Sequence, residues 1–261
     1  MKFKKLLSVL ILSGLLFGIT PVYSANKPIT DEETIYSYVN MNWWQDLNDP
    51  ILTDYIIKAI QNNKDLKLAT LKVEEATEGK NITRADEMPT IGISAVPALY
   101  KLPGSTSSDG LISLPVYANY ELDLFGKNRD KTKSMDKAIE ISRQNERASY
   151  ISIASAVGCT YYNIVKLDKF IEIQEKILKD RKEIYDLMKL SNDEGLISTA
   201  DTVNAHKSFI KADSDLIELK KLREKLLNML AVLIGDSPEN SALYERISYD
   251  DLVLSKSIPD Y

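Results

Sequence analysis

A stretch of 64 residues, 127–190, contains no proline and a single glycine, Gly158. Apolar residues recur along it every seven positions, which is typical of a helix that packs in a coiled coil. One column is formed by Tyr150, Val157, Ile164, Ile171, Leu178 and Tyr185, and a neighbouring column by Phe170, Ile177 and Ile184. At a rise of about 1.5 Å per residue, such a helix is about 96 Å long. A compact domain of this size could not enclose it.

A second helix is predicted to form a hairpin with the long one. Residues 191–195 are turn formers, and Gly195 suits the left-handed conformation that often ends a helix. Ser198 is a good N-cap for a helix over 199–234, with Asp201 near its positive N-terminal end. Apolar residues again recur every seven positions, at Ala205, Ala212, Leu219, Leu226 and Leu233. The pattern predicts a long, coiled-coil-like helical hairpin.

A third helix is predicted over 50–87, where Asp49 can serve as N-cap and Pro50 as the first helical residue. Its apolar stripe passes through Leu52, Ala59, Leu66 and Val73. The helices over 50–87 and 199–234 together contain slightly more residues than the helix over 127–190. Stacked end to end, they would cover its length.

Residues 112–124 follow a different period, because apolar and polar side chains alternate there. Strict alternation is typical of a strand. A second strand is predicted over 90–102, where Pro97 makes the alternation less regular, and the turn formers of 103–110 join the two strands as a hairpin. The predicted fold is therefore mainly α with a β-hairpin.

A single hairpin leaves backbone groups unpaired at both edges, and only a closed barrel satisfies them inside a bilayer. We therefore expect transmembrane strands completed by strands from other chains. The side expected to face lipid carries Leu114, Val116, Ala118, Tyr120 and Leu122. Glu121 and Asp123 would face a water-filled lumen, where they favour cations or are simply solvated. A soluble sheet packed on a helix is the alternative interpretation of this alternation.

The first 24 residues have a basic start, an apolar middle and a small-residue exit, which predicts a secretory signal peptide cleaved after Ser24. An extended segment is expected over 25–49.

Loss of three signal-peptide lysines changes the net charge from −5 to −8, which argues against nucleic acid as a partner. Cys159 is expected to be a buried small residue, with a reactive thiol as the alternative.

Several motifs resemble the TolC-type outer membrane efflux protein family, in order and spacing. The opening of the family's proteins is matched by Trp44, Asp49-Pro50, Leu52, Ala59, Asn63-Lys64-Asp65-Leu66 and Ala69, followed by Arg84-Ala85 and Pro89. The family's most recognisable signature lies where the second strand passes into the long helix. The segment similar to it in this chain is Tyr120-Glu121-Leu122-Asp123-Leu124-Phe125-Gly126-Lys127. The hairpin tip matches at Gly195-Leu196, Ser198, Asp201 and Ala205, and the close of the last helix at Leu233-Ile234-Gly235. Together these matches extend from about residue 43 to 259.

The resemblance implies an outer-membrane channel subunit of a tripartite efflux or type I secretion system, with its helices in the periplasm. Family members are trimers whose protomers hold two such repeats in an α-barrel and a β-barrel, docked on a periplasmic adaptor protein fed by an inner-membrane pump. This chain matches only the first repeat, 50–235, and 236–261 would lead to a missing second one. Six copies, or a separate second-half chain, would restore the strand number.

The adaptor-docking tip is expected at Gly195, Leu196, Ile197, Ser198 and Asp201. Two apolar residues at a turn have little reason to be there unless something covers them. The alternative is that Leu196 and Ile197 fold back on their own helices.

The sequence is also compatible with two alternatives to a channel subunit: a soluble periplasmic coiled-coil scaffold, or a truncated fragment without function. His206, the only histidine, is expected at the surface and forms neither a metal site nor a nucleophile pair with Cys159. The sequence also contains no glycine-rich phosphate loop. No catalytic residue, metal or cofactor is therefore predicted from these motifs taken together. The protein is not expected to be an enzyme.

Overall fold

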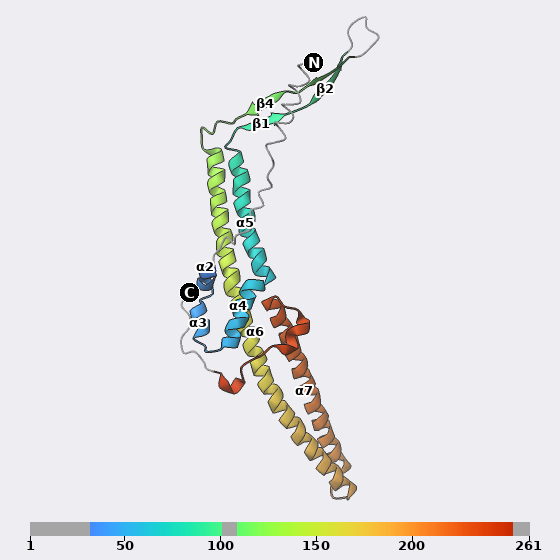
Figure 1. Ribbon diagram of the computed structural model, residues 1–261. Helices are drawn as coiled ribbons and strands as arrows, with labels where there is room; N and C mark the ends of the chain where they lie inside the picture. The colour runs from blue at the N-terminus through green and yellow to red at the C-terminus, as the bar shows by residue number, and fades with distance from the viewer. Residues whose placement is uncertain (1–31, 101–108, 253–261) are drawn as a thin grey trace, which may run out of the picture. The chain divides into compact units, whose positions relative to one another are not determined.

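The computed structural model describes residues 32–100 and 109–252 (Figure 1). The predicted signal peptide, 1–24, and the last nine residues of the C-terminal segment lie outside the described residues, as does most of the turn predicted over 103–110. No helix in the described part of the chain is long and apolar enough to cross a membrane.

The segment preceding Asp49 was expected to be extended, and its described part is instead helical. It forms α2 (Glu32–Tyr38) and α3 (Met41–Gln45), joined at Asn40, which has a left-handed φ of 50°. The indole Nε1 of Trp44 donates a hydrogen bond to the Val39 carbonyl, at 3.1 Å, inside the core. The expectation was wrong because both helices are too short for a periodic pattern and owe their stability to this burial.

The first long helix divides into two at Asn63, where a single helix over 50–87 was predicted. These are α4 (Pro50–Asn62) and α5 (Lys64–Ala85). Asp49 caps α4, as predicted, and Asn63 caps α5 by accepting hydrogen bonds from the backbone N–H groups of Asp65 and Leu66. The apolar stripe of Leu52, Ala59, Leu66 and Val73 is fully buried along both helices.

The two predicted strands pair as an antiparallel hairpin, but each is interrupted. The four strands are β1 (Thr90–Ile93), β2 (Val96–Tyr100), β3 (Asp109–Ser113) and β4 (Val116–Asn119), paired β1 with β4 and β2 with β3. Pro115 has no N–H to donate, and it falls at the interruption between β3 and β4. The predicted extent to residue 124 was wrong, because β4 ends at Asn119.

Helix α6 (Lys127–Asp193) is the long helix, and α7 (Thr199–Ile234) returns beside it. Figure 1 shows α5 packed along the N-terminal part of α6 and α7 along its C-terminal part. The α6 column is buried from Tyr150 to Ile171, whereas the second column, at Phe170, Ile177 and Ile184, stays 39–45% exposed. One face of the helical hairpin is therefore apolar and uncovered within the described chain.

The short helices α5 and α7 meet end to end beside α6. The Asn63 Nδ2 donates a hydrogen bond to the Leu233 carbonyl at 2.8 Å. Gly235 ends α7 with a φ of 73°, and a Cβ there would lie 2.5 Å from the Asn62 carbonyl oxygen. This contact between backbones explains why the predicted helix is broken at Asn63.

Gly235→Ala is expected to lower the free energy of unfolding by about 2 to 5 kcal/mol, because a left-handed alanine costs about 1 to 2 kcal/mol and the clash adds about 1 to 3. The matched control is Gly195→Ala, since Gly195 has nearly the same φ, 74°, and nothing within 4 Å of an added Cβ. Thermal unfolding followed by circular dichroism would compare them. Equal losses in the two variants would contradict the close packing at this junction.

After α7, two short 3-10 helices, η1 (Pro238–Leu243) and η2 (Tyr249–Asp251), return along the helices. The Asp168 carboxylate on α6 holds two guanidinium groups, that of Arg223 at 3.2 Å and that of Arg246 at 2.6 Å. The Tyr161 hydroxyl accepts a hydrogen bond from the Ile247 N–H at 3.0 Å. The described part of the C-terminal segment is thus fixed to α6 and α7.

Candidate functional site: the helical tip and the strand hairpin

The turn between α6 and α7, called here the tip (residues 191–201), is closed by its own hydrogen bonds. The Leu196 N–H donates to the Ser191 carbonyl at 2.8 Å, around Gly195 in its left-handed conformation. The Asn192 side chain donates to the Ile197 carbonyl at 3.0 Å. Ser198 caps α7 by accepting from the Asp201 N–H. The tip is therefore a defined turn that presents its side chains in fixed directions.

The two apolar residues of the tip behave differently. The Leu196 side chain is 76% exposed. Ile197 is half-buried and lines a shallow pocket with Ile184, Met188 and Ala205. Ile197 thus packs against its own helices, as the fold-back alternative expected, and Leu196 does not. Docking on an adaptor stays a prediction.

About two helical turns from the tip, three aromatic rings stack across the helical hairpin. The ring centroid of Tyr185 on α6 lies 4.6 Å from that of His206 and 6.2 Å from that of Phe209, both on α7. His206 is exposed, as predicted. The seven-residue columns indicated Tyr185 as a packing residue, but the stack itself depends on the register between the two helices, which the sequence does not show.

The strand hairpin has one clearly apolar face. In the β1–β4 register, Ile91 is opposite Ala118 and Ile93 is opposite Val116, so their side chains share that face. All four are exposed in the described chain. The predicted lipid-facing set included Val116 and Ala118 within β4; Leu114, Tyr120 and Leu122 are also exposed but lie outside the strands. Ile91 and Ile93 belong to the first predicted strand, for which no lipid-facing residues were named.

Glu121 and Asp123 were predicted on the lumen side of a strand, but both lie after β4 has ended. The Asp123 Oδ2 accepts a hydrogen bond from the Arg129 N–H at 3.0 Å, at the start of α6. This bond, with others from the backbone of the first helical turn, holds the pKa of Asp123 below its usual range. Glu121 lies 3.4 Å from the Lys127 Nζ. Asp123 therefore caps the first turn of α6 from outside the helix, whose N-cap residue is Gly126, and alternation alone cannot distinguish this role from a strand position.

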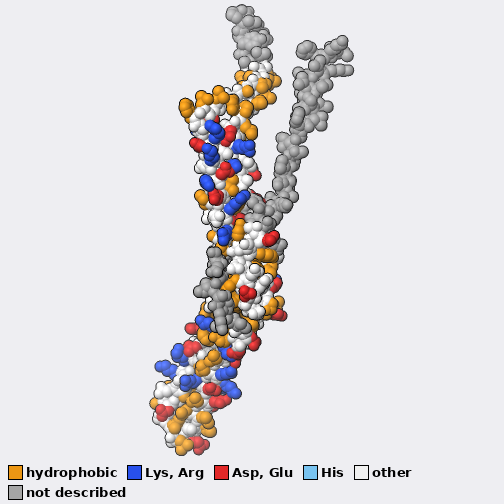
Figure 2. Space-filling view, turned by 90° about the vertical axis from the view of Figure 1, so that its left-hand side faces the viewer, with side chains coloured by type: hydrophobic (Ala, Val, Ile, Leu, Met, Phe, Trp, Pro, Cys, Tyr) orange, Lys and Arg blue, Asp and Glu red, His pale blue; other side chains and the backbone are white. Residues whose placement is uncertain are grey.

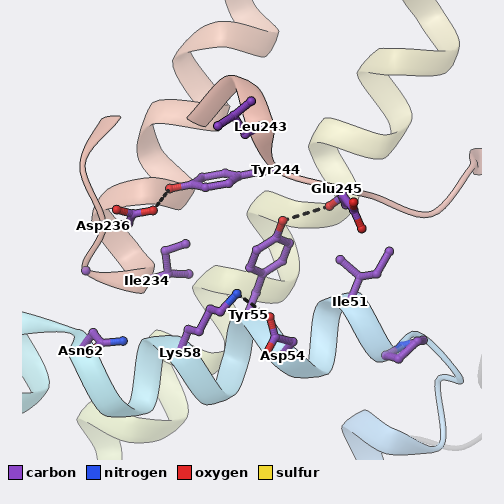
Figure 3. Close-up of a pocket in the computed structure, with 12 residues that line it drawn as sticks. Ile51, Asp54, Tyr55, Lys58, Asn62, Ile234, Asp236, Leu243, Tyr244 and Glu245 are labelled. Atoms are coloured by element: carbon purple, nitrogen blue, oxygen red, sulfur yellow. Dashed lines mark hydrogen bonds and ion pairs between the residues drawn. The ribbon is translucent and has the colours of Figure 1, made fainter. Parts of the chain in front are cut away.

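An open cleft of about 730 Å³ lies between α4, the end of α7 and the C-terminal segment (Figure 3). Several polar groups that line this cleft form hydrogen bonds or ion pairs with one another. The Tyr55 hydroxyl donates to the Glu245 carbonyl, the Tyr244 hydroxyl donates to the Asp236 carboxylate, and Lys58 pairs with Asp54. Burial raises the pKa of Tyr55 to about 12, so its hydroxyl stays a donor at neutral pH. The arrangement joins α4 to the C-terminal segment rather than presenting groups to a ligand.

Cys159 was expected to be buried, and it is exposed. The neighbouring Gly158 and Thr160 face the core, and Trp44 packs directly on Gly158. One step along a helix turns a side chain by about 100°, so Cys159 points away from this contact. Within residues 32–100 and 109–252, no group of three or more His, Cys, Asp or Glu is placed to hold a metal ion.

Comparison with known proteins agrees with this architecture. The family model for outer membrane efflux proteins matches residues 55–236. The antibiotic efflux pump outer membrane protein ArpC of Pseudomonas putida is 29% identical over 201 residues, which cover 74% of this chain and 41% of ArpC. The cation efflux system protein CusC of Escherichia coli K12 is 28% identical over 150 residues, or 57% of this chain and 33% of CusC.

Solved structures give the same result. The Campylobacter jejuni CmeC outer membrane channel matches with a TM-score of 0.71 and 25% identity, over 83% of this chain and 48% of CmeC. The outer-membrane channel OprN has the same fold, with a TM-score of 0.69 over 83% of this chain and 50% of OprN. The chain thus spans half or less of the length of each of these relatives. As its motifs indicated, the chain belongs to the outer membrane efflux protein family, whose channels are of the TolC type.

Proposed function

We propose that the protein is an outer-membrane channel subunit of a tripartite efflux or type I secretion system, with its helices in the periplasm. In this role it would pass substrates from a periplasmic adaptor and an inner-membrane pump across the outer membrane. The observation that carries the proposal is the exposed apolar face of the strand hairpin, made by Ile91, Ile93, Val116 and Ala118. Relatives with this fold are named as efflux-pump and cation-efflux proteins.

The described part of the chain leaves this apolar face exposed, so another molecule is expected to bury it. Lipid hydrocarbon is a suitable cover, because aliphatic side chains on one face of each strand form the outer wall of membrane barrels. In lipid, each unpaired backbone group at a strand edge costs several kcal/mol, so the hairpin needs neighbouring strands on both sides. We propose that further copies of this chain, six in the simplest case, or the strands of a second repeat close the barrel.

The connection from β4 to α6 has the composition of a membrane boundary. Leu122, Leu124 and Phe125 are exposed, and the Phe125 side chain is 95% exposed. Directly after Gly126, the first turns of α6 carry Lys127, Arg129, Asp130, Lys131 and Lys133. Figure 2 shows hydrophobic side chains gathered where the strands meet α5 and α6, next to helices whose surface is rich in charge. Aromatic and aliphatic residues beside basic ones favour the interface between hydrocarbon and water.

The helical hairpin offers surfaces for protein partners. The exposed column of Phe170, Ile177 and Ile184 on α6, and that of Val203, Ile210 and Ile217 on α7, each repeat every seven residues. A neighbouring subunit could pack against these columns as one coiled-coil helix packs against another. We propose that they lie between subunits in the assembled channel, whether trimeric with a second repeat or hexameric without one.

We propose that the tip docks on the adaptor through Leu196, with Gly195, Ile197, Ser198 and Asp201 holding the turn. Leu196→Asp is expected to weaken adaptor binding by about 2 kcal/mol or more, roughly 30-fold, because the carboxylate would lose its water at the contact. Cross-linking to a co-expressed periplasmic adaptor measures this, with the membrane-bound amount unchanged. The control is Leu243→Asp, since Leu243 is similarly exposed, at 80%, but far along the chain from the tip. Unchanged cross-linking in Leu196→Asp would refute the docking role.

The channel activity itself is tested by ion current. Detergent-extracted protein, reconstituted in a planar lipid bilayer, is expected to give discrete and stable conductance steps. A preparation that inserts in the bilayer and never conducts would contradict the proposal.

A further inference from the structure

The second face of the strand hairpin contains an unusual pair, Gly92 and Tyr117. They are directly opposite in the antiparallel register of β1 and β4. A Cβ added at Gly92 would overlap the Tyr117 ring at its Cζ, Cε2 and hydroxyl positions. The hydroxyl end of the ring therefore lies over the glycine, in space that the Cβ of any other residue would occupy. The Tyr117 side chain is nevertheless 51% exposed, so one side of its ring is open.

This pair lies on the face opposite the apolar one, because successive side chains in a strand point to opposite sides. Among the described residues of β1 and β4, that face carries Thr90, Gly92, Tyr117 and Asn119. None of these is charged. Glu121 and Asp123 follow the end of β4, where Glu121 lies beside Lys127 and Asp123 caps α6. If the apolar face meets lipid, the wall facing the lumen here is neutral, and Tyr117 is its one aromatic group among these residues.

We propose that Tyr117, whose ring lies over Gly92, lines the channel lumen and forms, with its copies in neighbouring hairpins, a ring of uncharged aromatic groups that selects planar organic cations over inorganic ions. This inference rests on the proposed channel function and names a substrate class for it. Aromatic faces attract both stacked π systems and cations, and they do so without a formal charge. With adjacent strands about 4.8 Å apart, hairpins placed side by side repeat this ring about every 10 Å around the wall.

The position of the ring along the chain fits a selecting role. Thr90 begins β1 only a few residues after α5 ends at Ala85, and Asn119 ends β4 shortly before α6 begins at Lys127. Gly92 and Tyr117 thus occupy the part of the hairpin next to the helices. A substrate leaving the proposed helical tunnel would meet these rings as it enters the barrel.

Block of potassium current by ethidium, a planar aromatic cation, in planar bilayers tests the proposal with the full-length protein. Tyr117→Leu is expected to weaken the block by about 3- to 30-fold, the range expected for loss of cation–π contacts. Tyr117→Phe keeps the ring and is expected to stay within about twofold of the unmodified protein. Tyr120→Leu is the matched control, since Tyr120 is exposed just beyond β4 and belongs to the side proposed to face lipid.

Gly92→Leu gives an independent measurement, because it keeps Tyr117 but displaces its ring, and it too is expected to weaken the block. It replaces Tyr117→Leu in the comparison if that variant fails to assemble. A conducting channel in which both Tyr117→Leu and Gly92→Leu are blocked as strongly as the unmodified protein would overturn the aromatic ring and leave the channel function standing. An unmodified protein that never conducts would overturn both.

Discussion

Replacing Trp44 with alanine is expected to lower the free energy of unfolding by about 3 to 5 kcal/mol, the usual cost of removing a large buried aromatic side chain. Trp44 is only 6% exposed, and its indole N–H donates to the Val39 carbonyl. Its ring also packs edge-on against Trp43, with 4.8 Å between centroids. Loss of this side chain should release α2 and α3 from α6. Chemical denaturation and limited proteolysis of the segment preceding Asp49 would measure both effects.

The same contact can be tested from α6 with a smaller change. A Cβ at Gly158 would lie 2.6 Å from the Trp44 ring, so Gly158→Ala should destabilise the protein. Helix propensity alone predicts the opposite sign, since alanine is better than glycine inside a helix by about 1 kcal/mol. The control is Cys159→Ala, at an exposed position on the same helix, which should stay within about 0.5 kcal/mol of the unmodified protein. A gain in stability for Gly158→Ala would show that Trp44 does not pack there.

Val116→Arg is expected to reduce insertion in the outer membrane, because an arginine on the lipid face of a barrel costs about 2 to 4 kcal/mol near the bilayer midplane. Ala118→Arg should act in the same way, since both side chains share the apolar face of β4. The measurement is the amount of protein in the outer-membrane fraction at equal expression.

Asn119→Arg is the matched control for these substitutions. Asn119 belongs to β4 but to its other face, opposite Thr90, so an arginine there would point to the lumen and keep its water. The protein should insert normally. Equal loss of insertion for Val116→Arg and Asn119→Arg would mean that the two faces of the hairpin are not distinguished by lipid.

The helical hairpin was predictable because its signals are local. Seven-residue spacing, Gly195 and Ser198 act within a few turns of one another, and the predicted column is buried at Tyr150, Val157, Ile164 and Ile171. The other buried residues of α6, among them Ala154, Tyr161 and Val165, lie outside the predicted columns. The break at Asn63 was not predictable in this way. Asparagine is tolerated in helices, and the break is stabilised by the Leu233 carbonyl and by Gly235, about 170 residues later.

The functional residues also differ in whether a local sequence signal or a contact with a distant segment determines their position. Exposure of Val116 and Ala118 followed from alternation. Exposure of Leu196 did not follow from the sequence, which left open whether this side chain folds back on its own helices. The role of Asp123 did not either, because the alternation of apolar and polar residues continues past the end of β4 and gives Asp123 the appearance of a strand residue. The Gly92–Tyr117 pair depends on the register between β1 and β4, which no single strand encodes.

The central claim is that the apolar face of the strand hairpin lies against lipid and that its edges are sealed by other strands. Cell fractionation followed by native mass spectrometry of the detergent-extracted protein tests this most directly. The account predicts recovery from the outer membrane as an assembly, either of several copies of this chain or of this chain with a second-half partner. A soluble scaffold or a non-functional fragment would instead be recovered from the periplasm without detergent, as a free monomer, and that result would contradict the account.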